Sequence, residues 1–400
     1  MERAPGIAGT NLEHARSHNR RVVIETVRLH GPLSRAEIAR LTGLTSQTVS
    51  NIADELQEGG ILRADAPRIG GRGQPATPLS INPDGAYSVG LQFDHHGLTA
   101  VLVDLAGQVR RRLTARVPDL RPETAVAQMA RGVRDLRARA PVDWSRVLGA
   151  GLAMPGPFNA AGRRLMGPTS LPGWEDPAVE RIAERIGLPL LIENDAKAAA
   201  IGEHLHGRAK RLSSFVYLFI GMGLGTGLFV DGHVYKGAGR NAGEIGHIVV
   251  EPNGRPCHCG NRGCLEQYVS LRAAYQALGI DAFDRNTPEE LGRRLEAGDP
   301  AVEGWLRSTL GPLRQAINMM EGMLDPETII LGGVMTEPLL RWIVERLPPL
   351  AVSVADHDDR PLPRLIVGTA GPDTPALGAA ALPIFDELNP QLNLLLKKSA

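Results

Sequence analysis

The feature that most constrains this chain is residues 243–266, which contain all three of its cysteines. The cysteines follow the spacing Cys257-x-Cys259-x4-Cys264, and His247 lies ten positions before the first. Three thiolates and one imidazole make a complete tetrahedral ligand set for Zn2+, with no position left for a reacting water. A Cys-x-Cys pair does not easily close as a disulfide, and three cysteines cannot all pair within one chain. The sequence therefore predicts a structural zinc site, with unligated cysteines on a loop as the alternative.

The composition bounds the class of protein. The formal charge is zero, with 44 basic and 44 acidic residues, so any DNA binding must come from a local surface. No run of about 18 apolar residues is present, and the first residues lack the apolar segment of a signal peptide. Few cysteines, all in one metal-like cluster, fit a reducing compartment. We therefore expect a cytoplasmic protein of two or three domains that has no membrane partner.

Residues 18–82 follow the order of a winged helix-turn-helix. A helical pattern over residues 19–30 ends at a Gly-Pro pair, and a capping box from Ser34 to Glu37 opens a second, short helix. A glycine turn leads to Thr45, which is a natural N-cap for a third helix. Two short strand-like segments around a basic turn follow and form the wing. Helix, tight turn and helix in this order predict a DNA-binding head.

We expect the start of the third helix to read DNA. Small polar side chains there suit base edges in the major groove, and the helix N-terminus suits a phosphate. A three-helix protein-interaction module with a solvated polar face is the alternative. Operators with two-fold symmetry match two-fold proteins, so we also expect a homo-oligomer, a dimer or a tetramer. The residues predicted to contact operator DNA are Ser46, Gln47, Thr48, Ser50 and Asn51 on the helix, with Arg68 and Arg72 on the wing.

The zinc loop and its surroundings resemble the signature of the ROK family, which comprises repressors, open reading frames and sugar kinases. In that family GE-x-GH is followed by C-x-CG-x2-GC-x-E, and GEIGH and CHCGNRGCLE match it here. The resemblance implies that His247 binds zinc with one ring nitrogen and faces a sugar with the other. It also implies that Glu244 and Glu266 accept hydrogen bonds from sugar hydroxyls, since a carboxylate is an acceptor-only group. From the residues alone, both glutamates could equally be solvated or support the metal.

Residues 190–203 resemble a second ROK signature, in which a strand delivers Asn194 and Asp195 to an Ala-rich helix. In the family's kinases this aspartate deprotonates the phosphoryl acceptor, and in non-catalytic relatives it can hydrogen-bond the ligand. From its position alone, Asp195 could also be the N-cap of the helix. Ser170 stands where the family has a sugar-contacting asparagine. The sugar-binding residues that follow are Asn194, Asp195, Glu244, His247, Glu266 and Ser170, with Asp195 as a residual base position and no catalytic residue.

The first phosphate-binding loop of the ROK kinases is degenerate in this sequence. Gln92 stands in place of the aspartate that serves the metal of ATP, and Asp94-His95-His96-Gly97 replaces Gly-Gly-Thr-Lys. Paired glycines let backbone amides approach a phosphate, whereas the carboxylate of Asp94 repels one. The glycines of residues 221–227 resemble the second phosphate loop, but they also suit a tight turn. We expect no kinase activity, and an ATP-dependent sugar kinase is the alternative.

The resemblance covers nearly the whole chain and implies an α/β fold, with a winged helix-turn-helix before a two-lobed, actin- or hexokinase-like domain. The implied function is a sugar-responsive repressor of carbohydrate uptake or catabolism genes, with a regulator that senses a protein partner as a further alternative. A sugar effector between the lobes would alter operator affinity. The expected segments are a mobile tail (1–17), the head (18–82), a small lobe (83–198) closed by a C-terminal helix (376–400), and a large lobe (199–375) with the zinc loop (247–264).

Overall fold

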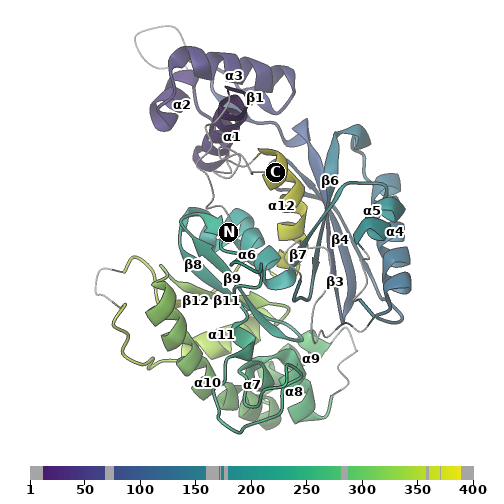
Figure 1. Cartoon of the computed structure of the whole chain (residues 1–400), viewed down its shortest axis with the longest axis vertical. Helices are drawn as coiled ribbons and strands as arrows, with labels where there is room; N and C mark the ends of the chain where they lie inside the picture. The colour runs from purple at the N-terminus through teal and green to yellow at the C-terminus, as the bar shows by residue number, and fades with distance from the viewer. Residues whose placement is uncertain are drawn as a thin grey trace, which may run out of the picture.

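The structure is a computed structural model, in which a small helical head sits on a larger body of two sheets (Figure 1). None of the helices in the described part combines the length and apolar character needed to cross a bilayer. The described residues are 12–67, 76–158, 171, 173–174, 179–280, 287–356, 360–369 and 371–388.

The head contains three helices and a two-stranded antiparallel sheet: α1 (Leu12–His30), α2 (Arg35–Thr42), α3 (Ser46–Glu58), β1 (Leu62–Ala64) and β2 (Leu79–Ile81). The capping box at Ser34 and Glu37 is present, and Thr45 caps α3 by accepting from the Thr48 amide. Gly43 ends α2 in the left-handed region, at φ 71°. Helix α1 begins at Leu12, so residues 12–17 are helical, and the expectation that they belong to a mobile tail is wrong.

The core of the head continues into the body. Val23, Val49 and Leu56 are fully buried in it, and Leu105 from the body joins the same apolar cluster. Ile384 of the last helix packs against this cluster as well. Because the apolar contact is continuous, the head is seated on the body and is not merely tethered by a linker.

The body contains two five-stranded mixed sheets with the same connectivity. In each, three antiparallel strands are followed by two parallel ones. This duplicated layout is the two-lobed architecture that the sequence predicts. The first sheet has the order β5-β4-β3-β6-β7, from β3 (Tyr87–Asp94), β4 (Gly97–Asp104), β5 (Val109–Ala115), β6 (Val147–Met154) and β7 (Leu190–Asn194). The second has the order β10-β9-β8-β11-β12, from β8 (Phe215–Ile220), β9 (Leu224–Val230), β10 (His233–Val234), β11 (Ile329–Gly333) and β12 (Leu365–Val367).

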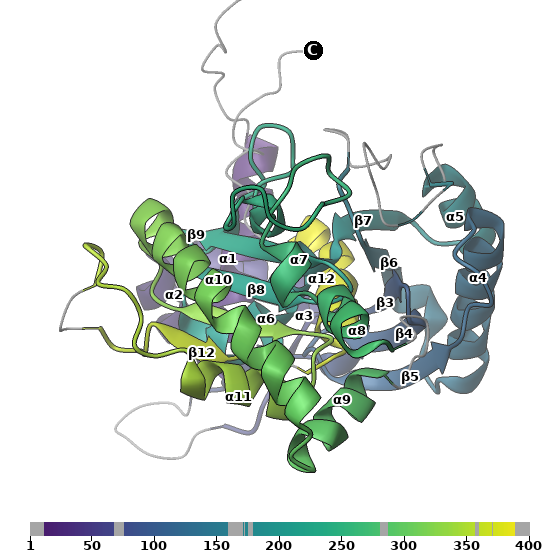
Figure 2. The same ribbon diagram turned by 90° about the horizontal axis from the view of Figure 1, so that it is seen from below.

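Two helices, α6 (Asp195–His206) and α12 (Thr374–Leu388), lie between the sheets (Figure 2). Helix α6 packs on the second sheet, α12 packs on the first, and the two helices pack on each other. A Cβ at Gly378 would overlap the carbonyl oxygen of Ala198, so glycine permits this close approach. The expected lobe boundary between residues 198 and 199 falls inside α6, which therefore joins the lobes and does not separate them.

The remaining helices cover the outer faces of the sheets (Figures 1 and 2). The first sheet is covered by α4 (Pro122–Arg139) and α5 (Val179–Ile186). The second is covered by α7 (Glu266–Val269), α8 (Leu271–Leu278), α9 (Thr287–Glu296), α10 (Pro300–Leu324) and α11 (Glu337–Arg346). The loop that carries the predicted zinc ligands lies between β10 and α7, at the entrance to the space between the lobes.

Candidate functional site

The four predicted metal ligands come together in the structure. The Nδ1 atom of His247 lies 3.6 Å from the Sγ atom of Cys257, and the Sγ atoms of Cys259 and Cys264 are 3.6 Å apart. All four donor atoms lie within 4.8 Å of one another. Zinc–sulfur bonds of about 2.3 Å in a tetrahedron place neighbouring ligand atoms roughly 3.8 Å apart, whereas a disulfide needs about 2.05 Å. The spacing therefore fits a bound metal ion and excludes a disulfide.

The pKa of one cysteine in the cluster is strongly shifted by its surroundings. Burial, and then hydrogen bonds with the neighbouring thiols, raise the pKa of Cys264 to about 12. A metal ion reverses this, because a coordinating thiol is deprotonated outright. Gln267 donates from Nε2 to the Sγ atom of Cys257 at 3.4 Å and supports that ligand from outside the cluster. Three soft sulfurs and one imidazole are the donors that zinc prefers.

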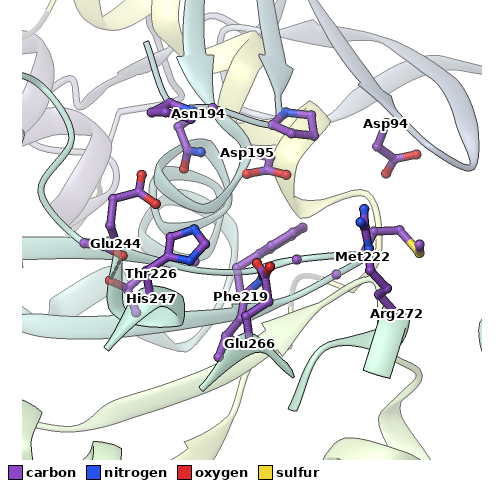
Figure 3. Close-up of a pocket in the computed structure, with 18 of the residues that line it drawn as sticks. Asp94, Asn194, Asp195, Phe219, Met222, Thr226, Glu244, His247, Glu266 and Arg272 are labelled. Atoms are coloured by element: carbon purple, nitrogen blue, oxygen red, sulfur yellow. Dashed lines mark hydrogen bonds between the residues drawn. The ribbon is translucent and has the colours of Figure 1, made fainter. Parts of the chain in front are cut away.

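A cleft beside the cluster collects polar side chains from both lobes (Figure 3). The first lobe supplies the β3–β4 turn and the junction of β7 and α6. The second supplies the β8–β9 turn, the loop before the metal ligands, and the starts of α7 and α8. Five predicted sugar-binding residues line this cleft together: Asn194, Asp195, Glu244, His247 and Glu266. The sixth, Ser170, lies outside the described residues.

Asn194 and Asp195 divide two roles at the start of α6. Asn194 is the N-cap, because its Oδ1 accepts from the amides of Ala196 at 3.0 Å and Lys197 at 3.3 Å. The capping alternative for Asp195 is therefore wrong, although its Oδ1 also accepts from the Ala196 amide at 2.8 Å. Burial, and then the nearby carboxylates of Asp94 and Glu244, raise the pKa of Asp195 to about 7. The cleft thus holds an Asn amide that can donate and a carboxyl that is partly protonated at neutral pH.

The metal side of the cleft holds two further carboxylates. Glu266 is buried, and its Oε2 accepts from the amide of Leu224 at 3.0 Å. Its Oε1 lies 3.4 Å from the Nδ1 atom of His258. Burial raises the pKa of Glu244, and the nearby His247 opposes that shift. Because the Nδ1 of His247 faces Cys257, its Nε2 is left for the cleft, as Figure 3 shows.

His258 is a cleft residue that sequence reasoning missed. It stands between two metal ligands, where the family signature accepts any residue, so the pattern carried no signal for it. Its ring contacts Glu266 and lies edge-on to the ring of His247, with centroids 5.2 Å apart.

The degenerate loop forms the tight β3–β4 turn at the far end of the cleft. Gln92 donates from Nε2 to Oδ2 of Asp94 at 3.1 Å, and the amide of His96 donates to Oδ1 at 2.8 Å. The carboxylate of Asp94 is thus held at this end of the cleft by two hydrogen bonds.

The start of α3 presents the predicted DNA-contacting residues at the surface of the head. Ser46, Gln47 and Asn51 are exposed, and Gln47 donates from Nε2 to Oδ1 of Asn51 at 2.8 Å. Thr48 bonds its hydroxyl to that of the cap residue at 2.8 Å. Ser50 differs, because its hydroxyl accepts from Arg35 of α2 at 2.9 Å. Arg68 and Arg72 of the wing lie outside the described residues.

Comparison with known proteins places the chain in a family. The ROK family profile matches residues 88–384. This chain belongs to the ROK family. The xylose repressor of Bacillus subtilis (strain 168) is 28% identical to it over 265 residues, which cover 65% of this chain and 67% of that protein.

Two solved structures share the fold. A ROK family transcriptional regulator, homologous to the E. coli MLC protein, is 24% identical, covers 96% of this chain and 99% of its own, and has a TM-score of 0.74. A ROK family glucokinase from Streptomyces griseus, in complex with glucose and AMPPNP, is 25% identical, with coverage of 74% and 99% and a TM-score of 0.63. The sequence-based ROK resemblance and the α/β architecture are therefore confirmed.

Proposed function

We propose that this protein is a sugar-responsive transcriptional repressor. The observation that carries the proposal is the direct packing of a winged helix-turn-helix head on a ROK body whose cleft converges polar groups. A repressor needs both parts, whereas a sugar kinase needs only the second. The relative named a xylose repressor supports the same function. The units we propose are the head, from α1 to β2, and two lobes joined by α6, the first of which is closed by α12.

The cleft can hold a sugar through complementary hydrogen bonds. Glu244 and Glu266 accept from hydroxyls, and the side-chain NH2 of Asn194 donates, because its oxygen already caps α6. Asp195 can accept or donate according to its protonation. Convergent polar groups between two lobes are what a sugar site requires. Ser170, which lies outside the described residues, remains a proposed sugar contact.

Helix α6 connects the cleft to the head. Its first residue, Asp195, faces the cleft, and its last turn lies beside α1 of the head. His204 and His206 of that turn line one groove together with Glu25 and Arg28 of α1. A sugar that prefers one arrangement of the lobes would move α6 and α12. The surface of the body on which the head packs would move with them. Such a sugar shifts the equilibrium only as far as its affinities for the two states differ.

On DNA, the exposed start of α3 would enter the major groove. Ser46, Gln47, Thr48 and Asn51 would meet base edges or phosphates, and Arg68 and Arg72 would reach the backbone from the wing. Ser50 would act with Arg35 at the edge of this face. Two heads in a homo-oligomer would read two half-sites, so a change in head position would change operator affinity.

Zinc in this proposal is structural. His247, Cys257, Cys259 and Cys264 would fill all four positions of a tetrahedral ion, which leaves none for substrate chemistry. When bound, the ion would fix the loop that carries Glu244. It would also hold the ring of His247 toward the cleft. Metal analysis of the purified protein tests this directly, with one zinc per chain as the expected result.

We also propose that the body is not a working kinase. The Asp94 turn replaces the loop that would approach the phosphates of ATP. A coupled assay for ADP release with a panel of sugars tests this. Sugar-dependent turnover that Asp195→Ala abolishes would restore the kinase as the function.

The experiment that tests the repressor proposal has two stages. Thermal unfolding of the full-length protein across a panel of sugars finds the effector, since a ligand at about 100 times its Kd adds about 2.7 kcal/mol of stability. Selection of bound fragments from genomic DNA then finds the operator. The proposal expects one sugar to stabilise the protein and to change its affinity for the selected DNA. A protein that binds no sugar but captures a protein partner would support the alternative of partner sensing.

A further inference from the structure

We propose that the cleft takes an uncharged sugar and discriminates against the phosphorylated form of the same sugar, with Asp94 as the specificity-determining residue. This inference rests on the proposed function and names the class of effector for the same site. It follows from three properties of the cleft: the sign of its charges, the place of Asp94, and the use of the backbone amides that a phosphate would need.

The described lining of the cleft is rich in carboxylates. Asp94, Asp195, Glu244 and Glu266 all line it, and Arg272 is the one guanidinium among the lining residues that the structure describes. Three histidines line it as well: His95 stands next to Asp94 in the β3–β4 turn, and the other two are engaged elsewhere. His247 faces Cys257 of the metal cluster through Nδ1, and His258 lies against Glu266. A dianionic phosphate entering this cleft therefore meets more negative than positive charge, whereas hydroxyl groups meet hydrogen-bond acceptors.

Asp94 occupies the end of the cleft where a phosphate would project. In Figure 3, Glu244 and Asn194 lie at one end, Asp195 lies in the middle, and Asp94 lies at the other end. A sugar that contacts Glu244 and Asp195 points its far substituent towards Asp94. The hydrogen bonds from Gln92 and from the His96 amide hold the carboxylate of Asp94 in place.

Two backbone amides of the glycine-rich β8–β9 turn are already used within the protein. The Leu224 amide donates to the carboxylate of Glu266 at 3.0 Å, and the Gly221 amide donates to the carbonyl of Gly223 at 3.0 Å. A phosphate-binding loop instead presents its amides to the ligand. In this chain a carboxylate of the protein takes one of those amides. The turn therefore offers fewer amides to a phosphate than such a loop does.

Arg272 is the group that opposes the proposal. It lies near the start of α8 and, in Figure 3, on the same side of the cleft as Asp94. One guanidinium is outnumbered by the four carboxyl groups that line the described part of the cleft. We therefore expect Arg272 to weaken the discrimination and not to reverse it.

The test is isothermal titration of the full-length protein with three matched pairs: xylose and xylose 5-phosphate, glucose and glucose 6-phosphate, and N-acetylglucosamine and its 6-phosphate. For the pair that binds, the wild-type protein should prefer the neutral sugar by at least about tenfold. Asp94→Asn keeps an acceptor for the His96 amide and removes the charge. It should raise the affinity for the phosphorylated sugar. The ratio of the Kd of the phosphorylated sugar to the Kd of the neutral sugar should fall at least about threefold.

Two controls separate the charge of Asp94 from other effects. Asp231→Asn removes an exposed carboxylate in the β9–β10 turn, outside the cleft lining, and should leave the ratio unchanged. Raising the salt concentration should narrow the wild-type ratio less than Asp94→Asn does, because a partly buried charge is incompletely screened.

The outcomes are distinguishable. Equal or tighter binding of the phosphate by the wild-type protein overturns this inference and leaves the sugar-responsive function in place. An unchanged ratio in Asp94→Asn, with neutral-sugar binding retained, removes Asp94 as the deciding residue. Binding of neither form in any pair counts against this inference and the proposed function together.

Discussion

Replacement of Asp195 by asparagine should make the stability of the protein less sensitive to pH. The pKa of this carboxyl is about 7 in the folded protein, chiefly because of burial, whereas an unfolded aspartate has a pKa of about 3.9. A carboxyl with a raised pKa binds its proton more tightly in the folded state. Its contribution to stability is therefore complete below about pH 4 and is lost as the pH rises to about 7. Above pH 7 the wild-type protein carries the full cost of the buried charge.

The size of the change in unfolding free energy follows from the pKa shift of Asp195. About three pKa units correspond to roughly 4 kcal/mol, and because the residue is only partly buried we halve this to about 2 kcal/mol. The asparagine side chain of the variant carries no charge and still offers an oxygen to the Ala196 amide. We therefore expect Asp195→Asn to gain about 2 kcal/mol over the wild-type protein at pH 8, and less than about 1 kcal/mol at pH 5.

Urea unfolding of both proteins at pH 5 and pH 8 measures this gain. Asp94→Asn is the matched control, since the charge of Asp94 is one cause of the raised pKa of Asp195. In that background the folded pKa of Asp195 should be lower, so the loss of stability should be smaller and should be complete at a lower pH. A gain that is the same at pH 5 and pH 8, or a loss of stability in Asp195→Asn at pH 8, would refute the reasoning.

Three further outcomes are expected. Cys259→Ser should lose bound zinc and the fold of the loop, measured by metal content and by proteolysis. His258→Ala should keep its zinc. Full metal content in Cys259→Ser would show that the ligand assignment is wrong. Asn51→Ala should weaken operator binding by about 1–3 kcal/mol at constant salt without changing thermal stability, and an unchanged Kd would remove it from the DNA contacts. Ser34→Ala should destabilise the head by about 1 kcal/mol through loss of the capping box, seen as faster local hydrogen exchange in α2.

Much of the architecture could be predicted from the sequence because its signals are local. The capping box at Ser34, the glycine that ends α2 and the buried apolar runs of β3, β4 and β6 each specify their element by short-range chemistry. The metal cluster could be predicted for a similar reason, since its last three ligands fall within eight residues of one another. The ROK resemblance then joined these local signals into a fold.

Other elements lacked a distinct pattern. Strand β5 is mostly exposed and rich in arginine, so its sequence (VRRRLTA) shows no buried run. Helices α5 and α11 are short and lie beside long loops, and their packing partners come from distant parts of the chain. The start of α1 was placed too late because its first turns are polar. In each case tertiary contact, and not local propensity, decides the structure.

The residues of the site divide in the same way, into features that local motifs predict and features that tertiary contacts decide. Sequence motifs brought together the five described residues expected to bind sugar, but they did not show that Asn194, and not Asp195, caps α6. They also did not show that Ser50 is held by Arg35, because this hydrogen bond joins two helices through their packing angle. The role of His258 depends on the loop folding back toward Glu266, which spacing alone does not specify.

The central claim is that a sugar in the cleft changes the affinity of the head for DNA. The most direct measurement is fluorescence anisotropy of the full-length protein on its selected operator duplex, at one fixed salt concentration, with and without saturating effector sugar. The account predicts a change in Kd of at least about fivefold, with a reciprocal change in sugar affinity when operator is bound. Glu244→Gln should reduce the response to sugar and leave sugar-free DNA binding intact. The same operator Kd with and without saturating sugar would contradict the account.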